Sequence, residues 1–190
     1  MALTVVLITA YLLGSIPTSY LVVERLTSRD IRTMGSGNPG TMNVWDTVGF
    51  RAALIVGLGD IAKGIAAVAI AYLVGLGNAG AVAAAICAVV GHDWSIFLRG
   101  DGGNGTAPAV GGMIGLFPVE GIIATSVAIA MFPVVRSRRI AGIVGLVLLP
   151  ALAYWAGGAD VKLIGVLLLL AFTALKIIRS EGFSTARPGQ

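Results

Sequence analysis

The sequence is poor in charge. Only 12% of its 190 residues are Asp, Glu, Lys or Arg, whereas 57% are hydrophobic and the mean hydropathy is +0.94. Soluble globular domains carry about 25% charged residues, so this chain has too little polar surface to coat a particle in water. The low charge therefore excludes a soluble globular protein and predicts that lipid surrounds most of its surface.

Metal-binding and redox-active residue types are nearly absent. Cys87 is the only cysteine and His92 the only histidine. A single cysteine excludes an intrachain disulfide, and a lone histidine without a cysteine cluster argues against a zinc site. No glycine-rich segment ends in the Gly-Lys-Ser/Thr of a P-loop or follows a predicted strand, so nucleotide-binding folds are not expected. We expect no metal, no cofactor and no nucleic-acid partner.

Long apolar stretches are abundant by contrast, and each is a candidate membrane helix because about 20 apolar residues cross about 30 Å of hydrocarbon. The fourth is short, so it is tilted, re-entrant or continuous with the fifth. The first follows no basic segment and contains polar residues, which favours a mature helix over a signal peptide. The seven stretches are Ala2–Val23, Arg51–Leu73, Gly80–Leu98, Thr106–Leu116, Val119–Val135, Ile140–Trp155 and Val161–Ile178.

The fold class follows from these stretches. No repeat of fixed period and no interdomain linker divides residues 1–190, so we predict a single all-α domain with seven transmembrane helices. On a seven-span path, every Lys and Arg except Lys63 and Lys162 lies on one face. Cytoplasmic loops carry the excess of Lys and Arg. The chain is therefore predicted to have its N-terminus outside, its C-terminus in the cytoplasm, and its location in the plasma (inner) membrane.

The first glycine-rich segment, 35–43, lies between the first two predicted spans. Glycines permit tight turns with positive φ and remove side chains, so backbone N–H groups can converge on an anion. Hydroxyl and amide groups alternate with these glycines, which favours an anion-binding loop over the alternative of a flexible linker. The glycines are Gly35, Gly37 and Gly40, and the polar residues are Ser36, Asn38, Thr41 and Asn43.

The second glycine-rich segment, 91–106, ends where the fourth predicted span begins. Backbone donors at the N-terminus of a helix, together with the helix dipole, favour a bound anion. We expect Thr106 to cap this helix and to donate to the same anion. The remaining residues of the expected anion nest are Gly102, Gly103, Asn104 and Gly105.

Three ionisable residues stand out from the apolar background. Asp60 and Lys63 are three residues apart in the second predicted span, hence on one helical face. Ionisable groups inside a span are costly and face the protein interior or water, so we predict a mutual ion pair, with Asp60 also bracing the loops. His92 is the third; a lone histidine near a helix end is more often structural than catalytic, but its place beside the second glycine turn favours a functional role.

Taken together, these segments resemble the signatures of the PlsY family, the acyl-phosphate-dependent glycerol-3-phosphate acyltransferases of bacterial membranes. The resemblance extends over nearly the whole chain in order and spacing, and the first motif is the most specific. The segments that carry it are Gly-Ser-Gly-Asn-Pro-Gly-Thr-Met-Asn (35–43), Asp-Ile-Ala-Lys-Gly (60–64), Gly-His (91–92) and Gly-Gly-Asn-Gly-Thr-Ala (102–107).

The resemblance implies a reaction in which a hydroxyl of glycerol 3-phosphate attacks the carbonyl of a fatty acyl phosphate, giving lysophosphatidic acid. The partners it implies are the lipid bilayer, fatty acyl phosphate, and glycerol 3-phosphate or another small acceptor. We expect positioning and oxyanion contacts from Ser36, Asn38, Asn43 and His92. The expected phosphate-binding residues are Gly35, Gly37, Gly40, Thr41, Gly102, Gly103, Asn104, Gly105, Thr106, Arg139 and Glu181.

Four positions depart from the family pattern. Asp46 stands where the family carries arginine, Asn104 where it carries lysine, Ala141 where it carries serine, and Gly182 where it carries asparagine. Charge-assisted contacts to a phosphate contribute about 1.5–3 kcal/mol each, so losing two cations weakens the expected grip on a dianion. Arg99, Arg138 and Arg139 are candidates to compensate.

These departures leave several interpretations open. The first is an acyltransferase that uses glycerol 3-phosphate, and the second is a relative with a less anionic acceptor. The third is a non-catalytic membrane protein of the same fold that binds lipid or a partner. A small transporter is a weaker fourth, since only Asp60 and Lys63 suggest a polar midplane. The sequence favours the first, and it carries no signal of the oligomeric state.

Overall fold

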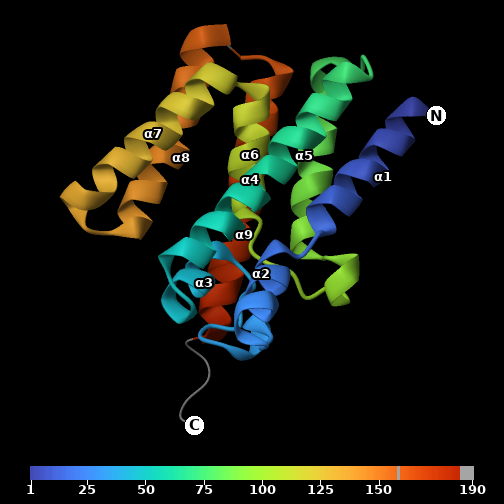
Figure 1. Cartoon of the computed structure of the whole chain (residues 1–190). Helices are drawn as coiled ribbons and strands as arrows, with labels where there is room; N and C mark the ends of the chain where they lie inside the picture. The colour runs from blue at the N-terminus through green and yellow to red at the C-terminus, as the bar shows by residue number, and fades with distance from the viewer. Residues whose placement is uncertain (158, 185–190) are drawn as a thin grey trace.

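The computed structural model describes residues 1–157 and 159–184, and these residues form helices joined by turns and loops (Figure 1). Two 3-10 turns, η1 (Ile31–Thr33) and η2 (Ile96–Leu98), accompany the α-helices. The α-helices are α1 (Ala2–Ser15), α2 (Thr18–Thr27), α3 (Thr41–Thr47), α4 (Phe50–Leu73), α5 (Gly77–Asp93), α6 (Thr106–Leu116), α7 (Pro118–Val135), α8 (Arg138–Gly157) and α9 (Val161–Ser184).

Six helical stretches in the described part of the chain are long and apolar enough to cross a membrane. α6, with 11 residues, is shorter than these. The prediction of an all-helical membrane fold is therefore confirmed, and most helices begin and end within a few residues of the expected positions. The six stretches are Ala2–Thr27, Phe50–Leu73, Gly77–Leu98, Pro118–Val135, Ile140–Gly157 and Val161–Ile178.

The first predicted helix, Ala2–Val23, is broken in the structure. α1 ends at Ser15, and α2 begins only after Pro17. The backbone of Ile16 has ψ 117°, outside the helical region. The residue before a proline is driven towards extended conformations, and proline itself has no N–H to continue the helix. The break frees backbone carbonyls in the middle of an apolar segment, where they need donors from elsewhere.

α6 is a separate helix, which excludes one of the alternatives for the fourth predicted span, continuity with the fifth. It ends at Leu116. The backbone of Phe117 has φ −135° and ψ 79°, which interrupts the helix before Pro118 starts α7. The two helices are therefore not continuous. The expected capping role of Thr106 is wrong, because Gly105 is the N-cap residue and Thr106 already lies within the first turn.

Close backbone contacts hold α1, α4, α5 and α6 together. A Cβ atom on Gly64 would lie 2.1 Å from the Pro108 carbonyl oxygen, and one on Gly111 would lie 2.0 Å from that of Ile61. A Cβ atom on Gly14 would lie 2.0 Å from the Ala88 carbonyl oxygen. Glycines at these points let neighbouring helices approach backbone to backbone, as small residues do in membrane helix packing.

Both glycine-rich segments lie towards the same end of the bundle. Figure 1 shows the N-terminus of α1 at the upper end, whereas α2, α3 and the C-terminal part of α9 lie at the lower end. The turn that follows α5 also lies at the lower end. α7 and α8 form a hairpin that stands to one side of the other helices. The fold therefore gathers the sequence motifs at one end and leaves the hairpin as a lateral wall.

Candidate active site

The first glycine-rich segment is shaped by the side-chain amide of Asn43, which is buried. Its Oδ1 accepts a hydrogen bond from the Ser36 backbone N–H (3.0 Å), and its Nδ2 donates to the carbonyls of Met34 (3.0 Å) and Ile31 (3.4 Å). A Cβ atom on Gly35 would lie 2.2 Å from Asn43 Oδ1, at a backbone φ of +53°. The segment therefore needs glycine at 35, and Asn43 uses its amide to hold the loop.

Ser36 and Asn38 present their side chains at the surface of this loop. Ser36 is exposed and its Oγ accepts a hydrogen bond from the Asn38 backbone N–H (3.4 Å). The loop is anchored to α2 by Ser19, which is buried and donates from Oγ to the Pro39 carbonyl (2.7 Å). Hence the loop has a fixed base on α2 and polar groups facing outward.

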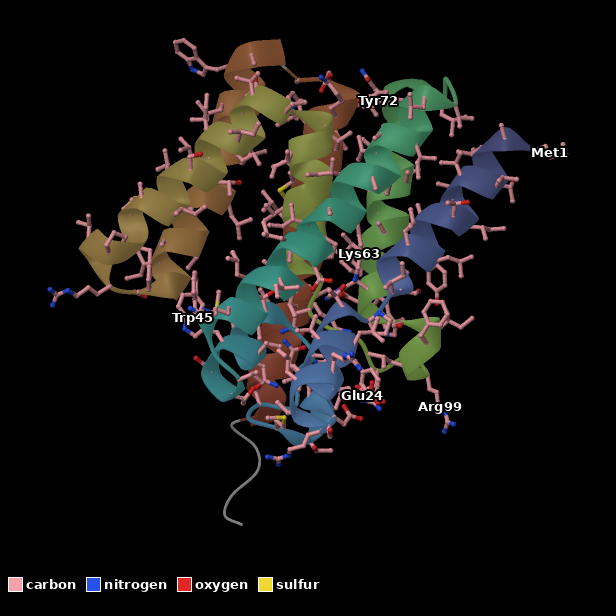
Figure 2. The ribbon with its side chains drawn as sticks, viewed as in Figure 1. Met1, Glu24, Trp45, Lys63, Tyr72 and Arg99 are labelled. Carbon is pink, nitrogen blue, oxygen red and sulfur yellow. The ribbon has the colours of Figure 1, made fainter. Side chains whose placement is uncertain are left out.

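A buried charged cluster lies beneath the second segment. Asp60 Oδ1 lies 2.6 Å from Lys63 Nζ and 3.7 Å from His92 Nδ1, and the three side chains are only 1%, 7% and 8% exposed. Lys63, at the centre of the bundle in Figure 2, also donates to the carbonyl of Ile16 at the break between α1 and α2. Ser95 Oγ donates to the neighbouring Ser15 carbonyl. The freed carbonyls of the helix break thus receive donors from α4 and from the turn after α5.

His92 lies in the last turn of α5, and the later glycines of the second segment, Gly102 and Gly103, fold directly over it. The backbone N–H of Gly103 donates to the His92 carbonyl (3.1 Å), and that of Gly102 donates to the Asp93 carbonyl (3.2 Å). A Cβ atom on Gly103 would lie 2.3 Å from His92 Nε2. His92 therefore lies between Asp60 on one side and the glycine backbone on the other.

One face of α4 links the two segments. A Cβ atom on Gly57 would meet the side chain of Thr41 at 3.3 Å, and Gly64 lies against the first turn of α6. Asp60 lies between these glycines on the same face. Gly57 and Gly64 are seven residues apart, a rise of about 10 Å along a helix. The first segment therefore contacts α4 about one turn before Asp60, and the start of α6 contacts it about one turn after.

Unpartnered polar atoms gather in this region. In the described part of the chain, the buried side-chain atoms without a hydrogen-bond partner are Ser15 Oγ, Thr41 Oγ1, Asp60 Oδ2 and both carboxylate oxygens of Asp93. Buried polar groups are normally hydrogen-bonded, and exceptions indicate water, an ion or a functional site. All of them lie beside the two glycine-rich segments, the charged cluster or the helix break.

Three residues at this end were not singled out from the sequence as site residues: Asp93, Ser95 and Lys176. Lys176 of α9 places its Nζ 4.3 Å from the centroid of the Trp94 ring, and its charge acts on both His92 and Asp93. The available signals were a carboxylate next to the lone histidine and a lysine late in the last apolar stretch. Neither signal indicates proximity across more than 80 residues of sequence.

Of the arginines expected to compensate for lost cations, Arg99 is the one whose side chain is described. Arg99 is exposed, with φ +58°, and points away from the bundle in Figure 2. Arg138 and Arg139 begin α8 and Glu181 lies in α9, but their side chains fall outside the described residues.

Arg32, which precedes the first glycine segment, is engaged by two carboxylates. It lies 2.7 Å from Asp30 and 3.6 Å from Asp101, which lies within the second segment. Hydrogen bonds from Arg32 hold the pKa of the Asp30 carboxyl below its ordinary value. Arg32 therefore joins the two glycine segments at the surface.

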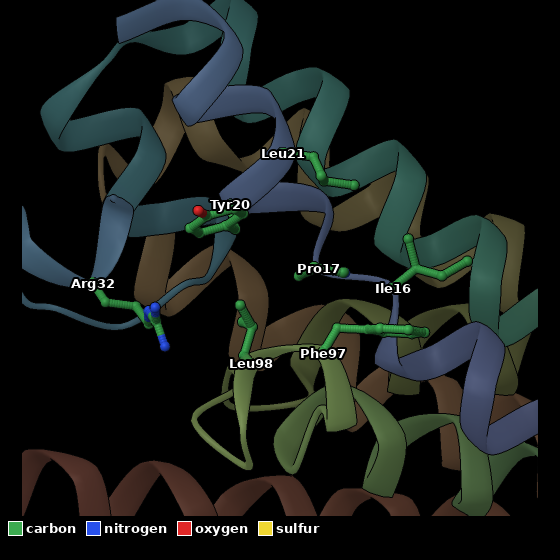
Figure 3. Close-up of a pocket in the computed structure, with 7 residues that line it drawn as sticks. All are labelled: Ile16, Pro17, Tyr20, Leu21, Arg32, Phe97 and Leu98. Atoms are coloured by element: carbon green, nitrogen blue, oxygen red, sulfur yellow. The ribbon is translucent and has the colours of Figure 1, made fainter. Parts of the chain in front are cut away.

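Two cavities lie near these groups. One of about 450 Å³ lies beside the helix break, with Tyr20 and Arg32 on one side and Phe97 and Leu98 on the other (Figure 3). Its lining is mostly apolar, so it suits an apolar group better than a small polyol phosphate. The second, of about 120 Å³, lies between α6, α7 and α8 and begins at Thr106. Its other lining residues include Val110, Ala124, Leu146 and Leu149.

Comparison with known proteins identifies the family. Residues 4–182 match the family model described as glycerol-3-phosphate acyltransferase. Glycerol-3-phosphate acyltransferase 1 of Dehalococcoides mccartyi is 42% identical over 171 residues, which cover 86% of this chain and 82% of the relative. The enzyme of that name from Desulforudis audaxviator is 39% identical over 176 residues, or 92% of this chain and 88% of the relative.

A solved structure agrees with these relatives. The glycerol 3-phosphate form of PlsY, an integral membrane glycerol 3-phosphate acyltransferase, superposes with a TM-score of 0.85 at 25% identity. The match covers 100% of this chain and 96% of that one. The fold, the length of the match and the motifs agree, and the resemblance inferred from the sequence is confirmed: the chain is a multi-span integral membrane protein that belongs to the glycerol-3-phosphate acyltransferase, or PlsY, family.

Proposed function

We propose that this protein transfers a fatty acyl group from acyl phosphate to a hydroxyl of glycerol 3-phosphate, with lysophosphatidic acid and phosphate as products. Membership of the family supports the acyltransferase activity. The observation that carries the assignment of the site is the gathering of unpartnered buried polar atoms between two glycine-rich segments. The Ser15 and Thr41 hydroxyls among these atoms can donate hydrogen bonds to an anionic substrate, whereas the Asp60 and Asp93 carboxylate oxygens are acceptors that need a donor or a cation.

The chemistry requires positioning more than it requires a strong base. An acyl phosphate is an activated mixed anhydride; the acceptor oxygen forms a bond to the carbonyl carbon while the carbon–phosphate oxygen bond breaks. The hydroxyl proton leaves with the departing phosphate. Orientation of the two substrates and donors aimed at the developing oxyanion supply the acceleration. The exposed Ser36 hydroxyl and the backbone N–H groups that begin α6, which point away from the helix body, suit those tasks.

The remaining expected site residues receive supporting roles. Asn43 holds the first segment through three hydrogen bonds. His92, held beside Asp60, supports the backbone of Gly102 and Gly103 from below. We therefore propose that Ser36 and Asn38 contact substrate, and that Asn43 and His92 position the loops that do so.

The acyl chain of the donor is proposed to lie between α6, α7 and α8. The cavity there begins at Thr106, beside the second glycine segment, and continues along apolar side chains. An acyl phosphate bound in this way has its phosphate at the glycine backbone and its chain among the membrane helices. Apolar burial of about 0.8 kcal/mol per methylene would hold the chain in place.

We propose seven crossings within one domain, with α6 as the short one. The N-terminus then lies outside, and the glycine segments and C-terminus lie at the cytoplasmic face of the plasma membrane. The excess of Lys and Arg at the lower end of the bundle supports this orientation. The termini of the described chain also lie towards opposite ends of the bundle (Figure 1), as an odd number of crossings requires.

The test is phosphate release from palmitoyl phosphate by the purified protein, with and without glycerol 3-phosphate, with lysophosphatidic acid detected by mass spectrometry. We expect release that depends on the acceptor, and a large loss in Ser36→Ala at unchanged thermal stability. Release that does not depend on glycerol 3-phosphate would favour a less anionic acceptor. This is the main alternative function, because Asp46 and Asn104 stand where the family carries cations. No release at all would favour a non-catalytic protein.

A further inference from the structure

Residues 100–106 of the second glycine segment include no Lys or Arg. Residues 100–106 read Gly-Asp-Gly-Gly-Asn-Gly-Thr, and the carboxylate of Asp93 is fully buried beneath them. A substrate phosphate that approaches this backbone carries negative charge towards a site that already holds a carboxylate. Backbone N–H groups alone provide only partial charges, so a cation from another element is needed if the proposed function holds.

The cations around the site differ in how fully they are engaged. Lys63 is bound to Asp60 and to the Ile16 carbonyl. Arg32 is bound to Asp30 and Asp101, and Arg99 points away from the bundle (Figure 2). Lys176, among the described residues, makes no ion pair and no hydrogen bond through its amine.

Lys176 also lies next to the residues on which the glycines of the second segment rest. Its Nζ sits 4.3 Å from the centroid of the Trp94 ring, one residue beyond Asp93, and α9 is held there by the Trp94–Phe172 ring contact at 5.8 Å. The glycine segment rests on the same two residues, since Gly102 and Gly103 donate to the carbonyls of Asp93 and His92. Lys176 and the glycine backbone thus adjoin the same His92–Asp93 pair.

The present contact of Lys176 is a weak one. A cation over an aromatic ring gains less than a charge-assisted hydrogen bond to phosphate, and the flexible lysine stem lets the ammonium move between the two. We propose that Lys176 is the cation that binds the phosphate group of a substrate at residues 102–106. It would thereby replace, from α9, a charge that the second glycine segment lacks at Asn104.

α9 supplies a matched control. Lys162, near the start of the same helix, has its Nζ 4.3 Å from the centroid of the Phe117 ring. It lies at the opposite end of α9 from the glycine segments, so it has the same kind of contact without a nearby site. Lys162→Met therefore measures the loss of a lysine–aromatic contact, and Lys176→Met measures that loss together with any loss of phosphate binding.

The first experiment compares wild type, Lys176→Met, Lys176→Arg and Lys162→Met in the palmitoyl phosphate assay. We expect Lys176→Met to raise KM for glycerol 3-phosphate or for palmitoyl phosphate by about tenfold or more, and the arginine variant to recover most of it. The substrate whose KM rises identifies whose phosphate is bound. Equal KM values in Lys176→Met and Lys162→Met would overturn the inference.

A second measurement does not depend on activity. Inorganic phosphate should raise the melting temperature of the wild type and of Lys162→Met, and should raise that of Lys176→Met much less. Absence of stabilisation in the wild type, or equal stabilisation in all variants, would also overturn the inference. A wild type that is stabilised through Lys176 yet transfers no acyl group would instead contradict only the proposed function.

Discussion

The four closely packed helices α1, α4, α5 and α6 differ sharply from the hairpin of α7 and α8. Within its apolar window, the α5 stretch is 56% buried, whereas the α7 and α8 stretches are only 11% and 17% buried. In the four-helix group, glycines such as Gly64 and Gly111 lie against backbone carbonyls, while a Cβ atom on Gly142 of α8 would meet nothing within 4 Å. The molecule therefore combines a closely packed group of four helices with a hairpin whose surface is largely exposed.

The difference matches the two halves of the proposed reaction. The four-helix group holds the Asp60–Lys63–His92 cluster and supports both glycine segments, where small displacements of donors are costly. The hairpin borders the proposed path of the acyl chain, where apolar contacts are non-directional and tolerate variation. We infer that close packing of the four helices positions the groups that bind phosphate, and that the α7–α8 hairpin binds the acyl chain.

The largest expected effect is the removal of Asp60. Asp60→Ala leaves Lys63 buried without its carboxylate, and breaking a buried pair in this way costs about 3–5 kcal/mol. Thermal unfolding in detergent should show the loss, whereas Ser126→Ala, on the exposed face of α7, should change stability by no more than about 0.5 kcal/mol. Asp60→Ala combined with Lys63→Met should regain stability without regaining activity; equal losses in the single and double variants would contradict the pairing.

Adding one methyl group should discriminate the two regions almost as strongly. In Gly111→Ala the new Cβ atom would lie 2.0 Å from the Ile61 carbonyl oxygen, so α4 and α6 must separate at a cost of about 3 kcal/mol. In Gly142→Ala the methyl group meets open space, and the higher helix propensity of alanine should leave stability unchanged or slightly raised. Melting temperatures that fall equally in both variants would remove the distinction between the regions.

Hydropathy predicted most of the helical bounds correctly, because each stretch had to be apolar for its length. It failed at Ile16, since the apolar pattern continues through the break and only Pro17 signals it. The Asp60–Lys63 pair was predictable because helical spacing brings positions 60 and 63 to one face. The approach of His92 to Asp60 was not, since it depends on how α5 packs against α4.

The residues of the site also divide into those that the sequence predicts and those that depend on tertiary packing. Glycine density located both segments, because close backbone approach excludes side chains whatever the tertiary structure. The hydrogen bonds of Asn43 within the loop were not predictable, since a sequence does not show which groups a side-chain amide contacts. Lys176 was overlooked because the last apolar stretch gives no indication of which residues its end adjoins.

Gly103→Ala should damage activity more than stability. The Cβ atom would lie 2.3 Å from His92 Nε2, so either the ring or the backbone of the second segment must shift. Misplacing catalytic donors by about 1 Å costs about a hundredfold in rate. We expect such a loss in kcat/KM, with wild-type values in Gly157→Ala, whose Cβ atom would meet nothing within 4 Å. Full activity in Gly103→Ala would contradict the positioning role of His92.

A substitution in the α7–α8 hairpin should change the preference of the enzyme for the length of the acyl chain. Leucine at Gly142 would fill part of the cavity between α6, α7 and α8, which Gly142 helps to line. Since each buried methylene contributes about 0.8 kcal/mol, the preference for palmitoyl over lauroyl phosphate should fall by about tenfold. The KM for glycerol 3-phosphate should change less than the KM for palmitoyl phosphate, because Gly142 lies on the proposed path of the acyl chain. An equal loss with both donors would place the acyl chain elsewhere.

The smallest effect is expected at the rim of the first glycine segment, where Asp30 and Arg32 are both partly exposed. A carboxyl whose pKa is lowered on folding contributes stability that is present above its unfolded value of 3.8 and is lost as the pH falls through the lower folded value. Asp30→Asn keeps an oxygen for the Arg32 N–H but removes the charge, so it should cost less than about 1 kcal/mol near neutral pH. The melting temperatures of variant and wild type should begin to converge below about pH 4 and should meet only below the lowered folded pKa of Asp30. A gap that persists in acid would mean that the ion pair contributes nothing and that Asp30 acts through its hydrogen bonds to the η1 turn alone.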